Sequence, residues 1–292
     1  ELDIALDRHS EEIAAIVANE AEPDFENTIA ALEASGEALD KVLSAFFAVA
    51  GADATPRRQE LQRAFSPKLA KHFADISANP ALFAKVKSVW DRRDTLNLDA
   101  QDARQLFLVH RGYVRAGAAL SGEEAERMKA IKERLAVLGT AFTQNLLKDE
   151  SDWVMELTEE DLEGLPDFLI DAARAAGTEM GRDGPVVTLS RSLIVPFLQF
   201  SPRRELRETA WKAWTARGAF GGETDNRAIA AEVLALRQER AELLGYGNFA
   251  QYKLETEMAG TPEAVRNLLL QVWEPAKAQA LADQDVLSAM AA

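Results

Sequence analysis

Apolar side chains recur every three or four residues along most of the chain, a spacing that is typical of amphipathic α-helices. In the N-terminal part the spacing connects Phe25, Ile29, Leu32, Leu39, Val42, Leu43 and Phe46. Thr55-Pro56 and Asn79-Pro80 each place a capping side chain before a proline at the first helical position. Further apolar residues follow both pairs at helical spacing, so the pattern predicts that a helix begins at each of them.

The strongest helical pattern begins at Ser121, where Glu124 lies three residues on, as in a capping box. Beyond it the apolar positions keep a three–four rhythm that resembles the seam of a coiled coil: Met128, Ile131, Leu135, Leu138, Phe142 and Leu146. The pattern predicts a long helix that packs against other helices.

Two short β-prone stretches, residues 153–157 and 185–189, interrupt the helical pattern. Between them, residues 166–176 predict a short helix that stops at Gly177. We therefore expect a mainly α fold with a small α/β insertion near residues 152–200. The corresponding domains are an N-terminal helical domain (1–150), the insertion (151–200) and a further helical segment (201–292).

Helices are predicted again after the insertion. One carries Ile229, Val233, Leu236 and Leu243, and Asn248 is placed to cap the next. Thr261-Pro262 opens another, with the following apolar residues on one face: Val265, Leu268, Leu269, Val272 and Trp273. This face is expected to need a partner. Residue 1 is Glu rather than Met, and the helical pattern continues to Ala292 without a Gly, Asn or Pro stop. We expect the chain to be part of a longer protein, cut within a helix.

Composition narrows the function classes. The 292 residues hold 33 Lys and Arg against 48 Asp and Glu, a net charge of −15, which argues against nucleic acid as the main partner. The absence of cysteine excludes disulfides, iron–sulfur clusters and thiolate zinc sites, and it fits a reducing compartment. The longest apolar runs are far shorter than the roughly 20 residues of a membrane-spanning helix, and no secretory leader is visible.

The negative charge is concentrated in residues 1–60, which hold 14 acids and 4 bases. These residues form either a solvated helix face or an acidic wall that attracts cations.

The residues show no complete active site. The three histidines, His9, His72 and His110, include no pair at the i, i+4 spacing of a helical metal site and no H-E-x-x-H. His110 is interpreted as a core histidine and His9 as a surface residue, and His72 has no partner nearby in the sequence. Gly245-x-Gly247 follows a helix rather than a strand, so it lacks the context of a dinucleotide-binding turn. We assign no catalytic, metal-binding or substrate-binding residue in this chain.

Several strings nevertheless resemble one family. Residues 23–36 (Pro-Asp-Phe-Glu-Asn-Thr-Ile-Ala-Ala-Leu-Glu-Ala-Ser-Gly) are similar to the N-terminal signature of the thimet oligopeptidase and peptidyl-dipeptidase family of zinc metallopeptidases. Residues 242–250 (Glu-Leu-Leu-Gly-Tyr-Gly-Asn-Phe-Ala) and 261–265 (Thr-Pro-Glu-Ala-Val) resemble the start of that family's peptidase domain. Residues 214–217 and 272–277 are closer to the bacterial peptidyl-dipeptidases than to the endopeptidases.

The resemblance implies one lobe of a two-lobed, cytoplasmic enzyme that hydrolyses short peptides in a deep channel. The family's zinc site uses H-E-x-x-H and a later Glu, which lie C-terminal to the region matched here. The chain alone is therefore expected to be inactive and to bind no zinc. Its partners would be short peptides and the C-terminal catalytic half, with neither nucleic acid nor membrane involved. Two alternatives remain: a non-catalytic helical scaffold or interaction protein derived from the family, and a metal-free helical enzyme that uses carboxylates.

Overall fold

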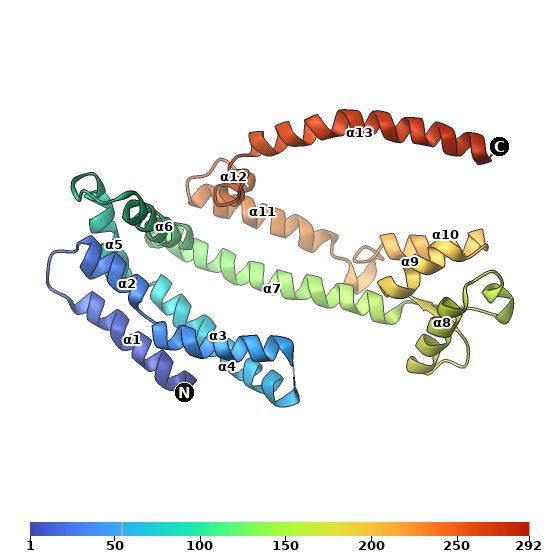
Figure 1. Cartoon of the computed structure of the whole chain (residues 1–292), viewed down its shortest axis with the longest axis horizontal. Helices are drawn as coiled ribbons and strands as arrows, with labels where there is room; N and C mark the ends of the chain where they lie inside the picture. The colour runs from blue at the N-terminus through green and yellow to red at the C-terminus, as the bar shows by residue number, and fades with distance from the viewer. Residues whose placement is uncertain (54, 292) are drawn as a thin grey trace. The chain divides into compact units, whose positions relative to one another are not determined.

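The computed structural model describes residues 1–53 and 55–291 and confirms the mainly α fold (Figure 1). Within these residues the helices are accompanied by one sheet of two strands. The chain divides into two compact units, Glu1–Met128 and Lys129–Ala292. The predicted domain limits at residues 150 and 200 remain predictions.

The first unit is a set of helices joined by short turns. Its elements are α1 (Leu2–Ala18), the π-helical turn η1 (Phe25–Ala30) that continues into α2 (Ala31–Ala34), α3 (Glu37–Ala52), α4 (Pro56–Ser77), α5 (Pro80–Asp91), the 3₁₀ turn η2 (Arg93–Thr95), α6 (Ala100–Ala116) and the start of α7 (Gly122–Asp152). Its main core lies where α1, η1, α5 and α6 meet, and the buried residues of that core are Ile13, Ile16, Phe25, Ile29, Leu82, Phe83, Val86, Val89, Leu106 and Tyr113.

Side-chain caps explain where these helices begin. The Oδ1 atom of Asn79 accepts hydrogen bonds from the backbone N–H groups at the start of α5, at 3.0 Å each. Thr55 caps α4 by accepting from the N–H of Arg58 at 3.4 Å, and Asp24 forms a reciprocal capping box with Asn27 at η1. Each cap satisfies N–H groups that have no partner inside the helix. The predicted starts at Thr55 and Asn79 are therefore confirmed.

The second unit contains the sheet and the later helices. Its elements are the rest of α7, β1 (Val154–Glu156), the 3₁₀ turn η3 (Glu159–Leu162), α8 (Asp167–Glu179), β2 (Val186–Thr188), α9 (Arg191–Phe200), α10 (Arg204–Thr215), the 3₁₀ turn η4 (Gly222–Thr224), α11 (Arg227–Leu243), α12 (Phe249–Leu254) and α13 (Pro262–Ala291). The Figure 1 ribbon shows α8, α9 and α10 gathered beyond the end of α7.

The predicted α/β insertion is confirmed. Strands β1 and β2 pair antiparallel, with Met155 opposite Val187, and α8 lies between them in sequence. The core of this region holds Leu157, Leu162, Leu165, Leu169, Val187, Leu189, Leu193, Ile194, Phe197, Ala210 and Ala213. Helix α9 escaped prediction because Ile194 and Val195 favour strands and Pro196 lies inside the helix. Tertiary burial of the apolar face of α9 outweighs these local preferences.

The prediction that the insertion's helix stops at Gly177 is wrong. Helix α8 passes through Gly177 and ends at Glu179, and the backbone turns at Gly181, whose φ is +67°. Gly177 is buried, and a Cβ atom placed on it would lie 2.0 Å from the carbonyl oxygen of Gly184. The glycine is therefore present for close backbone approach, whereas Gly181 ends the helix.

Helix α11 packs against the seam of α7, as the three–four rhythm predicts. Ile131 and Leu138 of α7 are buried together with Leu236 of α11. At the edge of this contact, Arg134 donates two hydrogen bonds to the carboxylate of Glu232, at 2.6 and 2.8 Å. The seam therefore stabilises the contact between two helices of the second unit.

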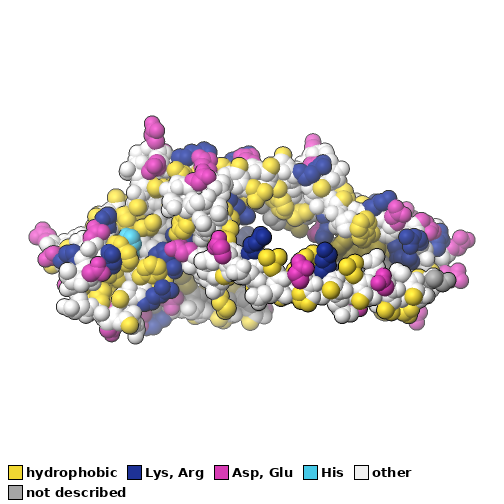
Figure 2. All heavy atoms as spheres, turned by 90° about the horizontal axis from the view of Figure 1, so that it is seen from above, with side chains coloured by type: hydrophobic (Ala, Val, Ile, Leu, Met, Phe, Trp, Pro, Cys, Tyr) yellow, Lys and Arg dark blue, Asp and Glu magenta, His cyan; other side chains and the backbone are white. Residues whose placement is uncertain are grey.

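Helix α13 is 30 residues long, yet no residue from Pro262 to Ala291, all of which the structure describes, is buried. Leu268 is 63% exposed and Trp273 58% exposed. Figure 2 shows hydrophobic side chains among charged ones on the face in view. The helix thus has an apolar face without the burial that normally stabilises one.

Candidate functional site

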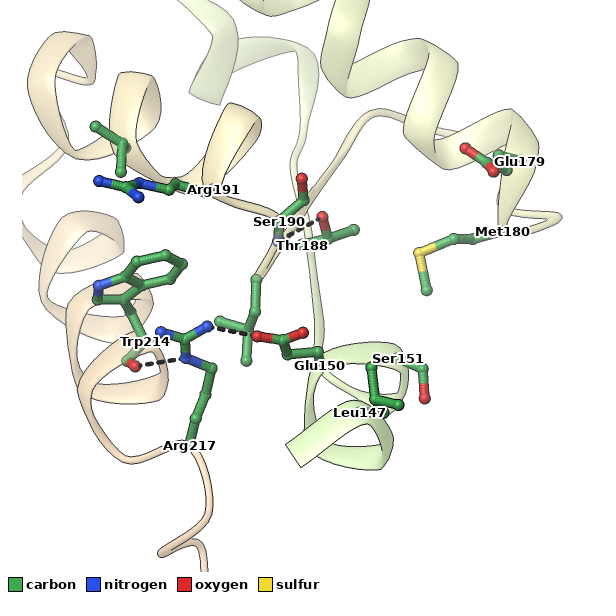
Figure 3. Close-up of a pocket in the computed structure, with 12 residues that line it drawn as sticks. Leu147, Glu150, Ser151, Glu179, Met180, Thr188, Ser190, Arg191, Trp214 and Arg217 are labelled. Carbon is green, nitrogen blue, oxygen red and sulfur yellow. Dashed lines mark hydrogen bonds and ion pairs between the residues drawn. The ribbon is translucent and has the colours of Figure 1, made fainter. Parts of the chain in front are cut away.

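The second unit contains an open cleft of about 1060 Å³ beside the two-stranded sheet (Figure 3). Its walls come from the end of α7, the end of α8, the segment from β2 into α9, and the end of α10. The lining residues are Leu147, Glu150, Ser151, Glu179, Met180, Thr188, Leu189, Ser190, Arg191, Val195, Trp214 and Arg217. The mixture of apolar walls with a few charged and hydroxyl groups is typical of ligand sites.

The central wall of the cleft is the short connection between β2 and α9. Leu189 is 1% exposed and anchors this connection in the core. The N–H of Ser190 donates to Thr188 Oγ1 at 3.3 Å, and the hydroxyls of Ser190 and Ser192 lie 2.8 Å apart. Arg191 follows as the first residue of α9. The buried leucine and the local hydrogen bonds thus hold the start of α9 at the cleft.

Arg217 lines the cleft but its charge is already compensated. Its Nη1 atom lies 2.5 Å from Oε1 of Glu150, and its Nε donates to the carbonyl of Trp214 at 3.0 Å. The guanidinium carbon also lies 3.9 Å from the centroid of the Trp214 ring. An arginine with an ion pair, a backbone acceptor and a ring contact is a structural part of the wall.

Arg191 and Glu179 are the two lining residues whose side-chain charge has no partner among the described residues. Both are exposed, and neither side chain has a hydrogen bond or ion pair within residues 1–53 and 55–291. Figure 3 shows them on opposite sides of Ser190, with Trp214 on the side of Arg191 and Met180 on the side of Glu179. Within the described part of the chain, the cleft therefore offers an unpaired cation and an unpaired carboxylate, separated by hydroxyl and apolar groups.

A buried polar network behind the cleft joins α7 to the turn before α11. The N–H of Gly218 donates to Oδ2 of Asp149 at 2.7 Å, and Asp149 is 5% exposed. Asn226 donates to the carbonyl of Phe142 at 2.9 Å and accepts from Asn145 at 2.9 Å. Because buried polar groups that lose a partner are costly, this network holds the turn in one conformation.

The structure places the histidines partly as the sequence suggests. His110 lies in the aromatic core of the first unit, with its ring stacked on Trp90 at a centroid distance of 4.4 Å and an interplanar angle of 4°. Burial lowers the pKa of His110. The interpretation of His110 as a core histidine is therefore confirmed.

The interpretation of His9 as a surface residue is wrong, and His72, which has no partner nearby in the sequence, has one in the fold. His9 is 8% exposed, and its Nδ1 lies 2.9 Å from Nε2 of His72. Ser35 lies 3.3 Å from the other ring nitrogen of His9. Burial, together with the proximity of His72, lowers the pKa of His9. Sequence reasoning missed the pair because 63 residues separate its members.

No group of three or more His, Cys, Asp or Glu side chains within the described residues is arranged to hold a metal ion. The His9–His72 pair provides two nitrogen atoms, whereas catalytic zinc sites use three protein ligands.

Arg191 and Glu179 were not singled out from the sequence. Neither belongs to a motif of defined chemistry, and only the tertiary structure brings the ends of α8 and β2 to one cleft. Two sequence signals lie at the cleft: the string at residues 214–217, since Trp214 and Arg217 line the cleft, and the β-prone stretch 185–189, which supplies Thr188 and Leu189.

No helix within residues 1–53 and 55–291 combines the length and hydrophobicity that crossing a membrane requires.

Comparison with known proteins covers most of the chain. The family model described as "Peptidase family M3" matches residues 197–292. Dipeptidyl carboxypeptidase of Escherichia coli K12 is 34% identical over 284 residues, which are 97% of this chain and 42% of that protein. Dipeptidyl carboxypeptidase of Salmonella typhimurium is 36% identical over 275 residues, 94% of this chain and 40% of that protein. Oligopeptidase A of Salmonella typhimurium is 26% identical over 272 residues, 91% of this chain and 40% of that protein.

The chain thus spans about two-fifths of the length of the curated relatives it matches. The family model covers residues 197–292, whereas the matches to these relatives extend over 91–97% of the chain. The resemblance carried by residues 23–36 and 242–250 agrees with both findings. The chain therefore belongs to peptidase family M3.

Proposed function

We propose that this chain is the N-terminal lobe of a zinc-dependent peptidyl-dipeptidase or oligopeptidase that acts on short peptides in a deep channel in the cytoplasm. In this proposal the chain shapes the channel and restricts the size of the substrate. The zinc ligands and the catalytic groups belong to a C-terminal half outside these 292 residues. Family membership supports the proposal, as do relatives that are named as carboxypeptidases and oligopeptidases.

The observation that carries the proposal is the exposed apolar face of α13. Leu268, Leu269 and Val272 lie close together on this helix and are 63%, 61% and 57% exposed. The helix lies within the segment that matches the family model. A helix of this kind gains most of its stability when its apolar face is buried, so the catalytic half is its expected partner.

The experiment compares the chain alone with the chain in the presence of the polypeptide encoded after residue 292 in its gene. Zinc content is measured by mass spectrometry after dialysis, and peptidase activity with an internally quenched short peptide. We expect no stoichiometric zinc and no cleavage from the chain alone. We expect a complex, bound zinc and chelator-sensitive cleavage when both parts are present.

A matched pair of variants tests the role of α13. Leu268→Glu places a charge on the exposed face of α13 and should prevent association with the C-terminal part. Leu234→Glu is the control, because Leu234 is 65% exposed on α11, outside that face. One tightly held zinc in the chain alone, with chelator-sensitive activity, would contradict the proposal. A chain that stays a compact monomer beside the C-terminal part would instead favour the non-catalytic scaffold.

A further inference from the structure

We propose that the cleft beside the sheet binds short peptides with free termini, holding the terminal carboxylate at Arg191 and the terminal amine at Glu179. This inference rests on the proposed function, because it takes peptides as the ligand class. It adds a binding site on this chain, separate from the zinc chemistry that the proposal places elsewhere.

Charge is unequally compensated among the residues that line the cleft. Arg191 has no partner carboxylate within the described part of the chain. Arg217, its neighbour in the same cleft, is compensated by Glu150. Guanidinium groups bind carboxylates through two parallel hydrogen bonds, so Arg191 is the group to which a terminal carboxylate would bind.

Glu179 lies at the opposite end of the cleft. Its side chain is also exposed and also lacks a partner among residues 1–53 and 55–291. It lies across Ser190 from Arg191 in Figure 3. A ligand that satisfies both ends must carry a negative and a positive group, as a peptide with free termini does. An inorganic anion would satisfy Arg191 alone.

The space between the two charged ends fits a short peptide. The cleft volume of about 1060 Å³ is near the upper limit of roughly 1,000 Å³ for ligand sites, and it far exceeds the space that a single ion needs. Met180, Val195 and Trp214 provide apolar surface for side chains. The hydroxyls of Ser151 and Ser190 can bond a peptide backbone. The lining therefore matches a short chain of amides more closely than a small ion.

The test measures binding by titration calorimetry with the 292-residue chain. The probe is a six-residue peptide of alanine and leucine with free termini. Two further peptides of the same sequence carry a C-terminal amide or an N-terminal acetyl group. We expect the free peptide to bind, and each blocked peptide to bind about tenfold more weakly, because each has lost one charge-assisted contact.

Two variants test which residue binds which terminus of the peptide. The Arg191→Ala variant should bind the free peptide about tenfold more weakly than the unchanged chain does, and it should bind the free and amidated peptides with equal affinity. Glu179→Gln should in the same way bind the free and acetylated peptides equally. Arg266→Ala is the control, because Arg266 is an exposed arginine of α13 outside the cleft. Circular dichroism verifies that each variant is folded, and all three side chains are exposed.

The result that would overturn the proposal is equal binding of free and blocked peptides, no binding at millimolar concentration, or displacement of the peptide by an equal concentration of inorganic phosphate. None of these measurements uses zinc or cleavage. The binding proposal can therefore fail while the two parts of the protein still reconstitute an active peptidase. Equally, peptide binding can persist if reconstitution gives no activity.

Discussion

Replacing Gly177 by alanine should destabilise the second unit, although helix propensity predicts the opposite. Gly177 lies inside α8, and Ala in place of Gly stabilises a helix interior by about 1 kcal/mol. In this fold, however, the new Cβ would lie 2.0 Å from the carbonyl oxygen of Gly184. Real Cβ contacts stay beyond 3.0 Å, so the two backbones must separate by at least 3.0 − 2.0 = 1.0 Å.

The size of the effect follows from what must move. The contacted atom is a backbone oxygen next to β2, and the N–H of Arg182 also donates to the carbonyl of Gly177 at 2.8 Å, so no flexible side chain can give way. Overpacking of this kind costs about 3 kcal/mol at the upper end of its usual range. After the gain of about 1 kcal/mol from helix propensity, the net loss of unfolding free energy is about 2 kcal/mol.

Gly139→Ala is the matched control in the same unit. Gly139 lies in the interior of α7, and a Cβ atom on it would meet no atom within 4 Å among the described residues. This variant should gain about 1 kcal/mol, which gives a difference of about 3 kcal/mol between the two substitutions. Urea unfolding followed by circular dichroism measures both, and hydrogen exchange of Val187 reports whether β2 loosens. A Gly177→Ala variant as stable as wild type would refute the close approach of α8 to Gly184.

Three further substitutions test the structure by urea unfolding. Acidification below pH 6.5 should destabilise the first unit, because the lowered pKa of His9 means that the folded chain takes up protons less readily than the unfolded chain. For this one group, the unfolding free energy should change with pH by no more than about 1.4 kcal/mol per pH unit. His9→Gln should reduce this pH dependence, and an unchanged pH dependence would refute a role for the His9–His72 pair. Asn226→Ala should cost about 2 kcal/mol, since it removes the buried Asn226 amide and leaves the half-buried amide of Asn145 and the carbonyl of Phe142 without their partner; a neutral result would contradict the network. Asn79→Ala should cost about 1 kcal/mol through loss of the α5 cap, and a loss below 0.3 kcal/mol would contradict it.

The elements of this protein could be predicted from its sequence to a large extent, because the signals that position them are local. Helix periodicity and the caps at Thr55 and Asn79 act over a few residues, and so does the alternation between β-prone and helical stretches near residues 152–200. Family membership was also visible in short strings such as residues 23–36. The exception is α9, whose local preferences favour a strand and whose burial prevails.

The candidate site and the special contacts depended on tertiary structure. His9 meets His72 from 63 residues away. Gly177 allows close approach to a backbone that returns after a turn, and its local appearance as a helix stop was misleading. Arg191 and Glu179 come to one cleft only because β2 pairs with β1 and α8 packs beside it. Periodicity reports which face of an element is buried but not what that face meets, since the partner is chosen by packing between distant segments.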